Sequence, residues 1–146
     1  MRRGTRQMHR LRILVADDIA QWRAKAQSLL KARPGWQVVG EACNGQQAVQ
    51  RTAELSPDLV LLDIGMPTLN GIEAAKQIRN ASPSTRIIFL TQDNDPDLRK
   101  AALDTGADQY VLKVSAASEL LPAIEAVCRL TAVLIAPSTQ QESLPA

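Results

Sequence analysis

The stretch Leu59–Gly71, "LVLLDIGMPTLNG", decides the fold and points to a function. Its first four residues are apolar, which is typical of a strand buried on both faces. Asp63 follows at once, and the residues after it, with Gly65, Pro67 and Gly71 among them, favour a loop over a longer strand. A buried strand that ends on a carboxylate holds that carboxylate rigidly at one edge of a sheet. The side chains at the ends of the neighbouring strands therefore decide what this carboxylate can do.

The rest of the chain alternates short apolar runs with helical patterns. Strands are expected at 12–16, 36–42, 58–62, 86–90 and 108–112, and helices at 19–33, 46–55, 71–80, 95–106 and 115–131. The apolar face of the first helix is expected to hold Trp22, Ala26, Leu29 and Leu30. This alternation produces right-handed crossovers and a parallel sheet covered on both faces. The predicted fold class is α/β, a doubly wound five-stranded parallel sheet with five helices.

The composition indicates one domain without a membrane span. The chain has 146 residues, 45% of them apolar but only 3% aromatic, so the core must be built from Leu, Ile, Val and Ala. No apolar run reaches the length of a transmembrane helix, and the N-terminus lacks the apolar segment of a secretory signal, so we expect a cytoplasmic protein. Cys43 and Cys128 are expected to be buried, reduced thiols rather than a disulfide or a metal pair.

The net charge of +2 comes from a short basic leader. Residues 1–12 hold five arginines and no acid, which leaves 12 basic and 15 acidic residues, or −3, for the rest of the chain. We expect residues 1–10 to be a disordered basic leader, and nucleic-acid binding by this chain alone is a weak hypothesis. Residues 11–131 are expected to form the domain, and 132–146, rich in Ser, Gln and Pro, a tail or the start of a linker.

Polar side chains follow four of the five predicted strands. Asp17 and Asp18 follow the first strand, Asp63 the third, Thr91 the fourth and Lys113 the fifth. Because the carboxyl ends of parallel strands share one edge, where such sheets bind ligands, we expect these side chains to converge. Each residue alone has an ordinary alternative, such as a helix cap, a turn hydroxyl or a surface lysine. The matched set favours a functional site.

The expected chemistry of this edge is phosphoryl transfer. Three crowded carboxylates repel one another unless a cation joins them, and Mg²⁺ suits a site with few protein ligands. An ionised Asp63 is then a competent nucleophile toward phosphorus, giving an acyl phosphate. Lys113 offers a fixed cation and Thr91 a hydroxyl donor to the transferring oxygens. Gly65 is expected to permit a close approach of the backbone after Asp63.

The residues at this point resemble a known family. The segments "ILVADDIAQWR", "PDLVLLDIGMPTLNGIEAAKQI", "IIFLTQ" and "GADQYVLKVSAASELLPAI" resemble the receiver domain of two-component response regulators, from about Leu11 to Arg129. The resemblance implies a flavodoxin-like sheet with the strand order 2-1-3-4-5. The segment "YVLKVSAASELLPAI" is most similar to receivers that carry a helix-turn-helix output domain of the LuxR type.

The resemblance implies a role for each matching residue at the acidic edge. Asp63 is the implied phosphoacceptor. Asp18 is the implied direct ligand of Mg²⁺, Asp17 a ligand through water, and Gly65 a ligand through its backbone carbonyl. The implied donor is a histidine kinase or a phosphotransfer protein, because the only histidine here, His9, lies in the leader.

The resemblance also implies a switch, with two departures from the family pattern. Thr91 and Lys113 are the implied phosphoryl-sensing pair, and Tyr110 the aromatic whose rotamer reports phosphorylation; the alternative for Tyr110 is a half-buried strand tyrosine. Val114 stands where many receivers have a proline after a cis bond, so a trans bond is expected here. Gln92 stands where a small residue is common, and its longer side chain is expected to restrict access to the phosphoryl group.

The predicted function is therefore that of a phosphoacceptor signalling domain. Phosphorylation is expected to switch a surface formed by the fourth helix, fifth strand and fifth helix, with a homodimer as one outcome and no membrane partner. DNA is expected as a partner only through an output domain outside this sequence; we favour a fragment of such a regulator over a stand-alone receiver. The alternatives are an interaction module that never uses phosphate and an Asp-nucleophile phosphatase. The second is disfavoured because Gly65 stands where such an enzyme needs a second acid.

Overall fold

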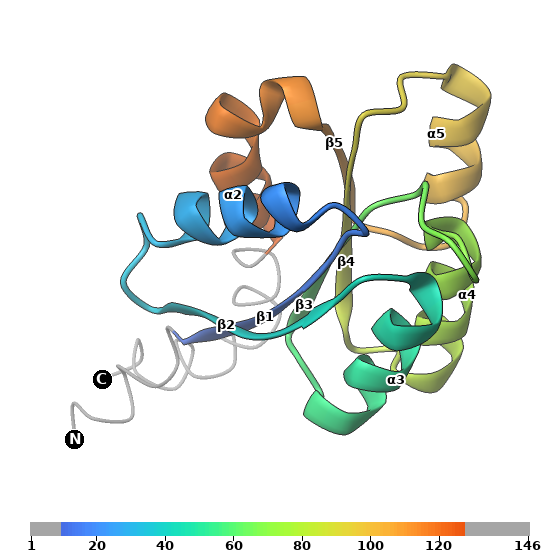
Figure 1. Ribbon diagram of the computed structural model, residues 1–146, viewed down its shortest axis with the longest axis horizontal. Helices are drawn as coiled ribbons and strands as arrows, with labels where there is room; N and C mark the ends of the chain where they lie inside the picture. The colour runs from blue at the N-terminus through green and yellow to red at the C-terminus, as the bar shows by residue number, and fades with distance from the viewer. Residues whose placement is uncertain (1–9, 128–146) are drawn as a thin grey trace, which may run out of the picture.

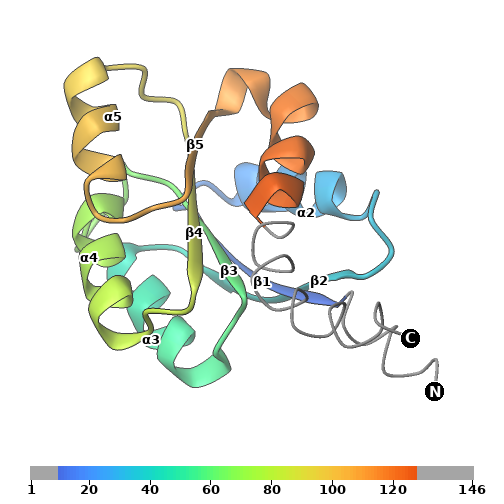
Figure 2. The ribbon, with the colours of Figure 1, turned by 180° about the vertical axis from the view of Figure 1, so that it is seen from behind.

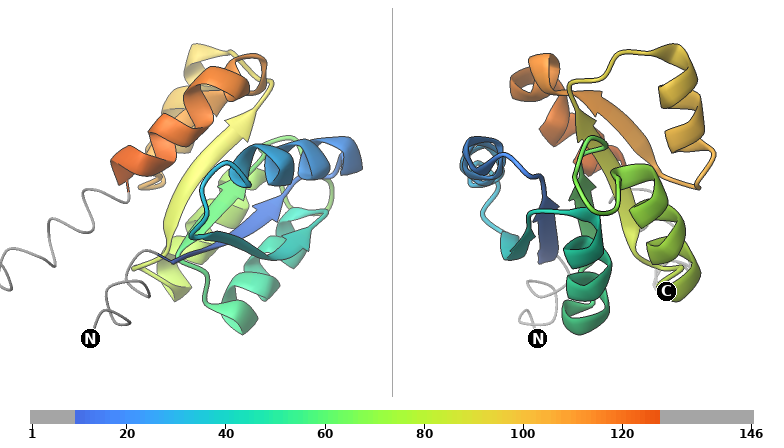
Figure 3. Two further views of the ribbon diagram at one scale, coloured as in Figure 1. Left: turned by 90° about the vertical axis from the view of Figure 1, so that its left-hand side faces the viewer. Right: turned by 45° about the vertical axis from the view of Figure 1, so that its right-hand side comes forward.

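A computed structural model of the protein describes residues 10–127. The predictions for the leader, the tail and Cys128 lie outside these residues. The sheet has five parallel strands in the order β2-β1-β3-β4-β5, which confirms the predicted order. The strands are β1 (Leu11–Ala16), β2 (Trp36–Ala42), β3 (Leu59–Leu62), β4 (Arg86–Thr91) and β5 (Gln109–Leu112). Their arrows run in one direction, so their carboxyl ends share one edge (Figure 3).

Five helices cover the two faces of the sheet in the described part of the chain. They are α2 (Ala20–Leu30), α3 (Gly45–Leu55), α4 (Gly71–Ala81), α5 (Pro96–Leu103) and a C-terminal helix over residues 116–127 that follows the 3₁₀ turn η1 (Lys113–Ser115). The α3, α4 and α5 helices lie on one face, and α2 and the C-terminal helix on the other (Figures 1 and 2). Of the helices within residues 10–127, none has the length and apolar character needed to cross a membrane.

The core consists of two apolar layers separated by the sheet. All four residues of β3 are buried, as its unbroken apolar run predicts. Val60 and Leu62 belong to the layer under α3, α4 and α5, whereas Leu59 and Leu61 belong to the layer under α2 and the C-terminal helix. Because successive strand residues point to opposite faces, β3 fills both layers and places its next residue, Asp63, firmly at the edge.

Side-chain caps fix the starts of three helices. Asn44, Asn70 and Asp95 each accept a hydrogen bond from a backbone N–H in the first turn of α3, α4 and α5, respectively. The predicted cap at Asp95, with a proline behind it, is thus confirmed. The predicted helix end at Gly106 is wrong, since α5 stops at Leu103 and Gly106 has a φ of +95° in the turn before β5.

Cys43 departs from the prediction of a buried thiol. It is exposed, and its thiol and backbone N–H both pair with the Gln47 side-chain oxygen. The reason is topological, because Cys43 follows β2, which is an edge strand of the sheet and has a neighbour on one side only. A position after an edge strand has less structure around it to exclude water.

Candidate functional site

Three carboxylates meet at the carboxyl edge of the sheet. Asp17 and Asp18 follow β1, and Asp63 follows β3, its immediate neighbour. The Asp63 N–H donates to the Ala16 carbonyl at 3.0 Å, so a backbone hydrogen bond joins the ends of β1 and β3 where their acids begin. One oxygen from each of the three carboxylates lies within 4.8 Å of the others. The predicted convergence of the three acids is therefore present.

Lys113 reaches the same place from the end of β5. Its ammonium lies 2.8 Å from Oδ2 of Asp17 and 3.2 Å from Oδ2 of Asp63. The lysine side chain is 4% exposed, and those of Asp17 and Asp63 are 5% and 7% exposed. Asp18, by contrast, is exposed. The group thus carries three negative charges against one positive charge, and only one of its acids faces solvent.

The second oxygen of each buried acid is held locally. Oδ1 of Asp17 accepts from the Ile19 N–H at 2.9 Å, and Oδ1 of Asp63 accepts from the Ile64 N–H at 2.8 Å. The N-cap of α2 is Ile19, which makes no side-chain capping bond, so neither Asp17 nor Asp18 caps that helix. These bonds orient the two carboxylates and leave their Oδ2 atoms facing Lys113.

The electrostatics of the acids leave room for a cation. Burial raises the pKa of Asp17, and the nearby charge of Asp63 raises it further, while hydrogen bonds from Lys113 and Ile19 act in the opposite direction. One ammonium therefore does not fully compensate these carboxylates. Three carboxylate oxygens within 4.8 Å of one another are the hard ligands that a divalent cation such as Mg²⁺ prefers. The residues present fit such an ion.

In the loop after Asp63, the glycine that packs closely against other backbone is Gly71 and not Gly65. Gly65 is exposed, and a Cβ added there would meet nothing within 4 Å, so none of the described protein groups packs closely against it. A Cβ on Gly71 would instead collide with the backbone carbonyl of Asp63. The Gly71 N–H also donates to the Ile64 carbonyl at 2.8 Å. Gly71 thus lets the start of α4 press against the segment that carries the acid, while the space beside Gly65 stays open.

Thr91 and Tyr110 are linked through a residue that the sequence analysis missed. Thr91 is fully buried, and its hydroxyl lies 3.3 Å from the Asp93 backbone N–H and 3.4 Å from the Asp93 carboxylate. The Tyr110 hydroxyl donates to the Asp93 carbonyl at 2.8 Å. Within residues 10–127 neither hydroxyl bonds to Asp63. An acid two residues after the strand end was the available signal for Asp93.

Tyr110 is held from several sides. It is 7% exposed, which is more buried than a half-buried strand tyrosine, and its ring centroid lies 6.2 Å from that of Phe89. The Arg99 guanidinium lies 5.2 Å from the same centroid. Burial is the largest cause of a raised pKa for the Tyr110 hydroxyl, so it stays protonated as a donor.

The two residues that depart from the family pattern, Val114 and Gln92, are both exposed. There is no cis peptide bond in residues 10–127, which confirms the trans bond expected before Val114. Val114 is 89% exposed, directly after the buried Lys113. Gln92 is also exposed, next to the buried Thr91, so its side chain lies on the solvent side of this edge.

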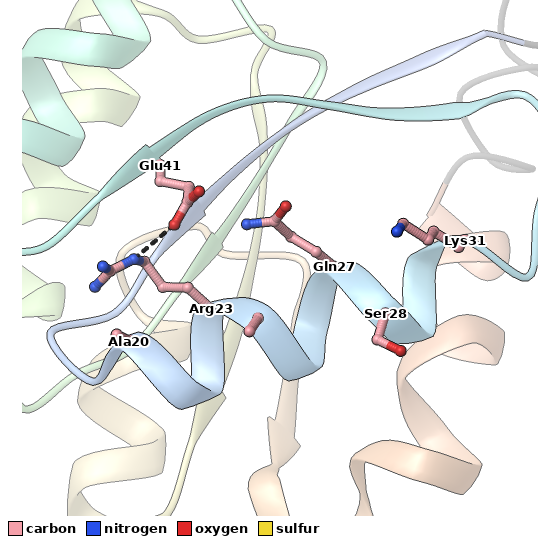
Figure 4. A pocket seen from close by; sticks show the side chains of 7 residues that line it. Ala20, Arg23, Gln27, Ser28, Lys31 and Glu41 are labelled. Atoms are coloured by element: carbon pink, nitrogen blue, oxygen red, sulfur yellow. Dashed lines mark hydrogen bonds and ion pairs between the residues drawn. The ribbon is translucent and has the colours of Figure 1, made fainter.

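Arg23, in the wall of a polar hollow beside β2, helps to hold the backbone of Asp17 in place. The hollow has a volume of about 420 Å³ and is lined by α2 residues and by Glu41 of β2 (Figure 4). Arg23 crosses it, with Nε 2.7 Å from Glu41 and another guanidinium nitrogen donating to the Asp17 carbonyl at 2.8 Å. The hydrogen bond from Arg23 lowers the pKa of Glu41. Arg23 therefore ties α2 to both β2 and the backbone of the acid.

Comparison with known proteins places this geometry in a family. The model of the "Response regulator receiver domain" matches residues 13–125. The chain belongs to the response regulator receiver family. The transcriptional regulatory protein LiaR of Bacillus subtilis is 39% identical over 119 residues, which are 82% of this chain and 56% of LiaR. The nitrate/nitrite response regulator protein NarL of Escherichia coli K12 is 39% identical over 112 residues, 77% of this chain and 52% of NarL.

The receiver also matches solved structures of the same kind. A two-component response regulator of the LuxR family from Aurantimonas is 35% identical with a TM-score of 0.78, covering 82% of this chain and 86% of that one. This confirms the resemblance to LuxR-type regulators. The receiver spans about half the length of the curated relatives it matches. It is a signalling domain of a two-component system, and the activity of a whole regulator is a separate matter.

Proposed function

We propose that Asp63 accepts a phosphoryl group from a histidine of a partner kinase or phosphotransfer protein. The observation that carries this proposal is the position of Asp63 beside Asp17, Asp18 and Lys113 at one edge of the sheet. In the transfer, a carboxylate oxygen of Asp63 forms a bond to phosphorus. The bond from phosphorus to the partner's imidazole nitrogen breaks, and the electron pair leaves with the imidazole.

The acidic group supplies the ligands that Mg²⁺ requires. Asp18 and Asp63 would bind it directly and Asp17 through water, together with the carbonyl of Gly65. That carbonyl accepts no hydrogen bond from the residues that the structure describes, so it is free for this use. When bound, Mg²⁺ supplies positive charge that keeps Asp63 ionised and offsets the charge on the phosphoryl oxygens.

The ammonium and hydroxyl at the neighbouring strand ends convert phosphorylation into a conformational change. Lys113 already touches Asp63 and would follow the negative charge onto the phosphoryl oxygens. Thr91 would leave Asp93 to donate to the same group, and Asp93 holds the Tyr110 hydroxyl. A change at Thr91 would thereby reach Tyr110 and the surface of α5, β5 and the C-terminal helix.

The wider role follows from the family. We place the receiver in the cytoplasm, where it would receive phosphate and form a homodimer or control an output domain that binds DNA. Its own chemistry is limited to self-phosphorylation from small donors and self-dephosphorylation. Gly65 stands where an Asp-nucleophile phosphatase would need a second acid, and residues 64–70 contain no Asp or Glu that could replace it.

Uptake of a phosphoryl group tests the proposal directly. The full chain is incubated with acetyl phosphate and Mg²⁺, and its intact mass is measured over time. The wild type is expected to gain one phosphoryl group, and Asp63→Asn none. Asp58→Asn is the matched control, because Asp58 also borders β3 but bonds to Arg12 at the opposite edge, and it should gain the group as the wild type does. No uptake by the wild type would favour the interaction module, and uptake by Asp63→Asn would assign another acceptor.

A further inference from the structure

Trp22 lies against the lysine of the site. Its indole ring centroid is 5.0 Å from the Lys113 ammonium, although the two residues are 91 positions apart in sequence. Trp22 was expected to belong to the apolar face of α2. Ala26 and Leu30 of that face are buried, but Trp22 is only half-buried and packs against the apolar layer under α2 and the C-terminal helix. Its position is therefore at the border between core and site.

The ring completes the surroundings of a desolvated ammonium. Lys113 is 4% exposed, so its ammonium has lost nearly all contact with water. An ammonium has three N–H donors, and among residues 10–127 the carboxylate oxygens close to it are those of Asp17 and Asp63. A tryptophan face within about 6 Å attracts a cation through its quadrupole, and the attraction is strongest where the cation is desolvated. The indole thus stabilises the part of Lys113 that the two acids leave uncovered.

We propose that Trp22 is a positioning residue for phosphoryl transfer at Asp63, acting through Lys113. Lysine carries its charge on a flexible four-carbon stem, so its ammonium needs external restraint to stay directed at one point. Asp17 and Asp63 provide restraint before the reaction, but both are proposed to turn to new partners when the metal and the phosphoryl group arrive. The ring of Trp22 remains in place through those exchanges. This inference rests on the proposed function of Asp63.

A second lysine near the Trp22 ring, Lys25, provides a control for the effect of any positive charge close to that ring. Lys25 lies 5.3 Å from the same centroid, one turn along α2, and is exposed. An exposed cation keeps its water and gains little from the ring. Substitution Lys25→Met should leave the rate of phosphorylation of Asp63 unchanged. The effect expected for substitution of Trp22 should therefore arise from its contact with the buried Lys113.

The rate of phosphoryl uptake measures the positioning role. With acetyl phosphate and Mg²⁺, Trp22→Leu is expected to slow phosphorylation of Asp63 about three- to tenfold, and Trp22→Phe, which keeps a weaker ring, to recover part of the rate. Trp36→Leu is the matched control. Trp36 is the other tryptophan of the chain, packs against the same apolar layer and has the Arg33 guanidinium 5.9 Å from its ring centroid, at the amino end of β2. Its substitution should leave the rate near that of the wild type.

A double-mutant cycle tests the contact without any phosphate. Urea unfolding midpoints are measured for Trp22→Leu, Lys113→Met and the double variant. The shift of the double variant is expected to be smaller than the sum of the two single shifts. The shifts of Trp36→Leu and Lys113→Met should add. Additive shifts for Trp22 and Lys113, or equal phosphorylation rates for Trp22→Leu and the wild type, would overturn the positioning role alone. Coupling in a chain that takes up no phosphoryl group would overturn the proposed function and, with it, the role built on it.

Discussion

The two edges of the sheet use the same residue types in opposite ways. At the amino edge, the Asp58 carboxylate accepts from the Arg12 N–H and the Asp108 carboxylate from the Ile87 N–H, both at 2.9 Å. These bonds join residues 46 and 21 positions apart. At the carboxyl edge, the backbone N–H groups that donate to the Asp17 and Asp63 carboxylates in the described part of the chain lie only one or two residues away. The first arrangement connects strands, whereas the second only orients the acid.

The two edges also differ in charge balance: positive groups outnumber the carboxylate around Asp108, and carboxylates outnumber the ammonium around Lys113. Asp108 lies 3.2 Å from Arg86 and 3.9 Å from Arg79, so two guanidinium groups surround one carboxylate. Arg79 also donates to three backbone carbonyls of the surrounding loops, those of Pro83, Thr85 and Gly106. At the carboxyl edge, Asp17 and Asp63 share Lys113, and the third acid of the group is Asp18. At the amino edge the charge of Asp108 is compensated by two guanidinium groups, whereas at the carboxyl edge one ammonium faces three carboxylates.

The largest expected effect is loss of stability at the amino edge. Asp108→Ala removes the acceptor of the Ile87 N–H and leaves two guanidinium groups without their carboxylate, so we expect a loss of about 2–3 kcal/mol in the free energy of unfolding. Urea unfolding measures it. The control Asp104→Ala breaks the exposed pair with Lys100 at 2.8 Å and should cost about 0.5 kcal/mol or less. Equal losses in the two variants would mean that Asp108 does not connect the strands energetically.

The same comparison explains what the sequence could predict. The strands follow from apolar runs that end at Gly, Pro and Asn residues, and the order of polar residues at the strand ends identified Asp17, Asp63 and Lys113. Each of these side chains continues directly from a strand, so strand geometry alone places it. The C-terminal limits of α2 and α5 were less certain, because turns with helical dihedral angles follow both helices.

Other features depend on how far a side chain reaches after folding. The ring of Trp22 meets Lys113 across two elements, and Asp93 links Thr91 to Tyr110 through a loop. Periodicity gives no information about such contacts. The close contact between Gly71 and Asp63 was missed for the same reason, since only the folded loop shows which backbone position presses on Asp63.

A smaller effect is expected when Mg²⁺ is added. A ligand that binds only the folded state stabilises it by about 1.4 kcal/mol at ten times its Kd, so the thermal midpoint of the wild type should rise with Mg²⁺. The measurement is thermal unfolding at constant ionic strength. Asp18→Asn should lose most of this gain, and Asp108→Asn should keep it, because Asp108 lies at the other edge. Equal gains in the two variants would place the ion elsewhere on the molecule.

The smallest expected effect comes from the electrostatic cost of burying the ionised Asp17 carboxylate. Burial and the charge of Asp63 raise the pKa of Asp17 above its ordinary value in the folded state. A carboxyl group with a raised folded-state pKa contributes fully to stability below its unfolded pKa, and that contribution is lost as the pH rises through the folded pKa. The ionised Asp17 therefore destabilises the metal-free fold at neutral pH. Part of this cost is offset by Lys113, which keeps the effect small.

Asp17→Asn should therefore make the metal-free protein more stable than the wild type at pH 7. The advantage should shrink as the pH falls toward the ordinary range of an aspartate, because the wild-type carboxyl group then becomes protonated as well. Urea unfolding without divalent cations, at several pH values, measures the difference between the two proteins. Asp58→Ala, at the amino edge, should instead lose stability at pH 7, since it removes the acceptor of the Arg12 N–H. A loss of stability in Asp17→Asn would mean that Lys113 compensates the charge of Asp17 fully. The ionised Asp17 would then not destabilise the metal-free fold, and in this respect the two edges would not differ.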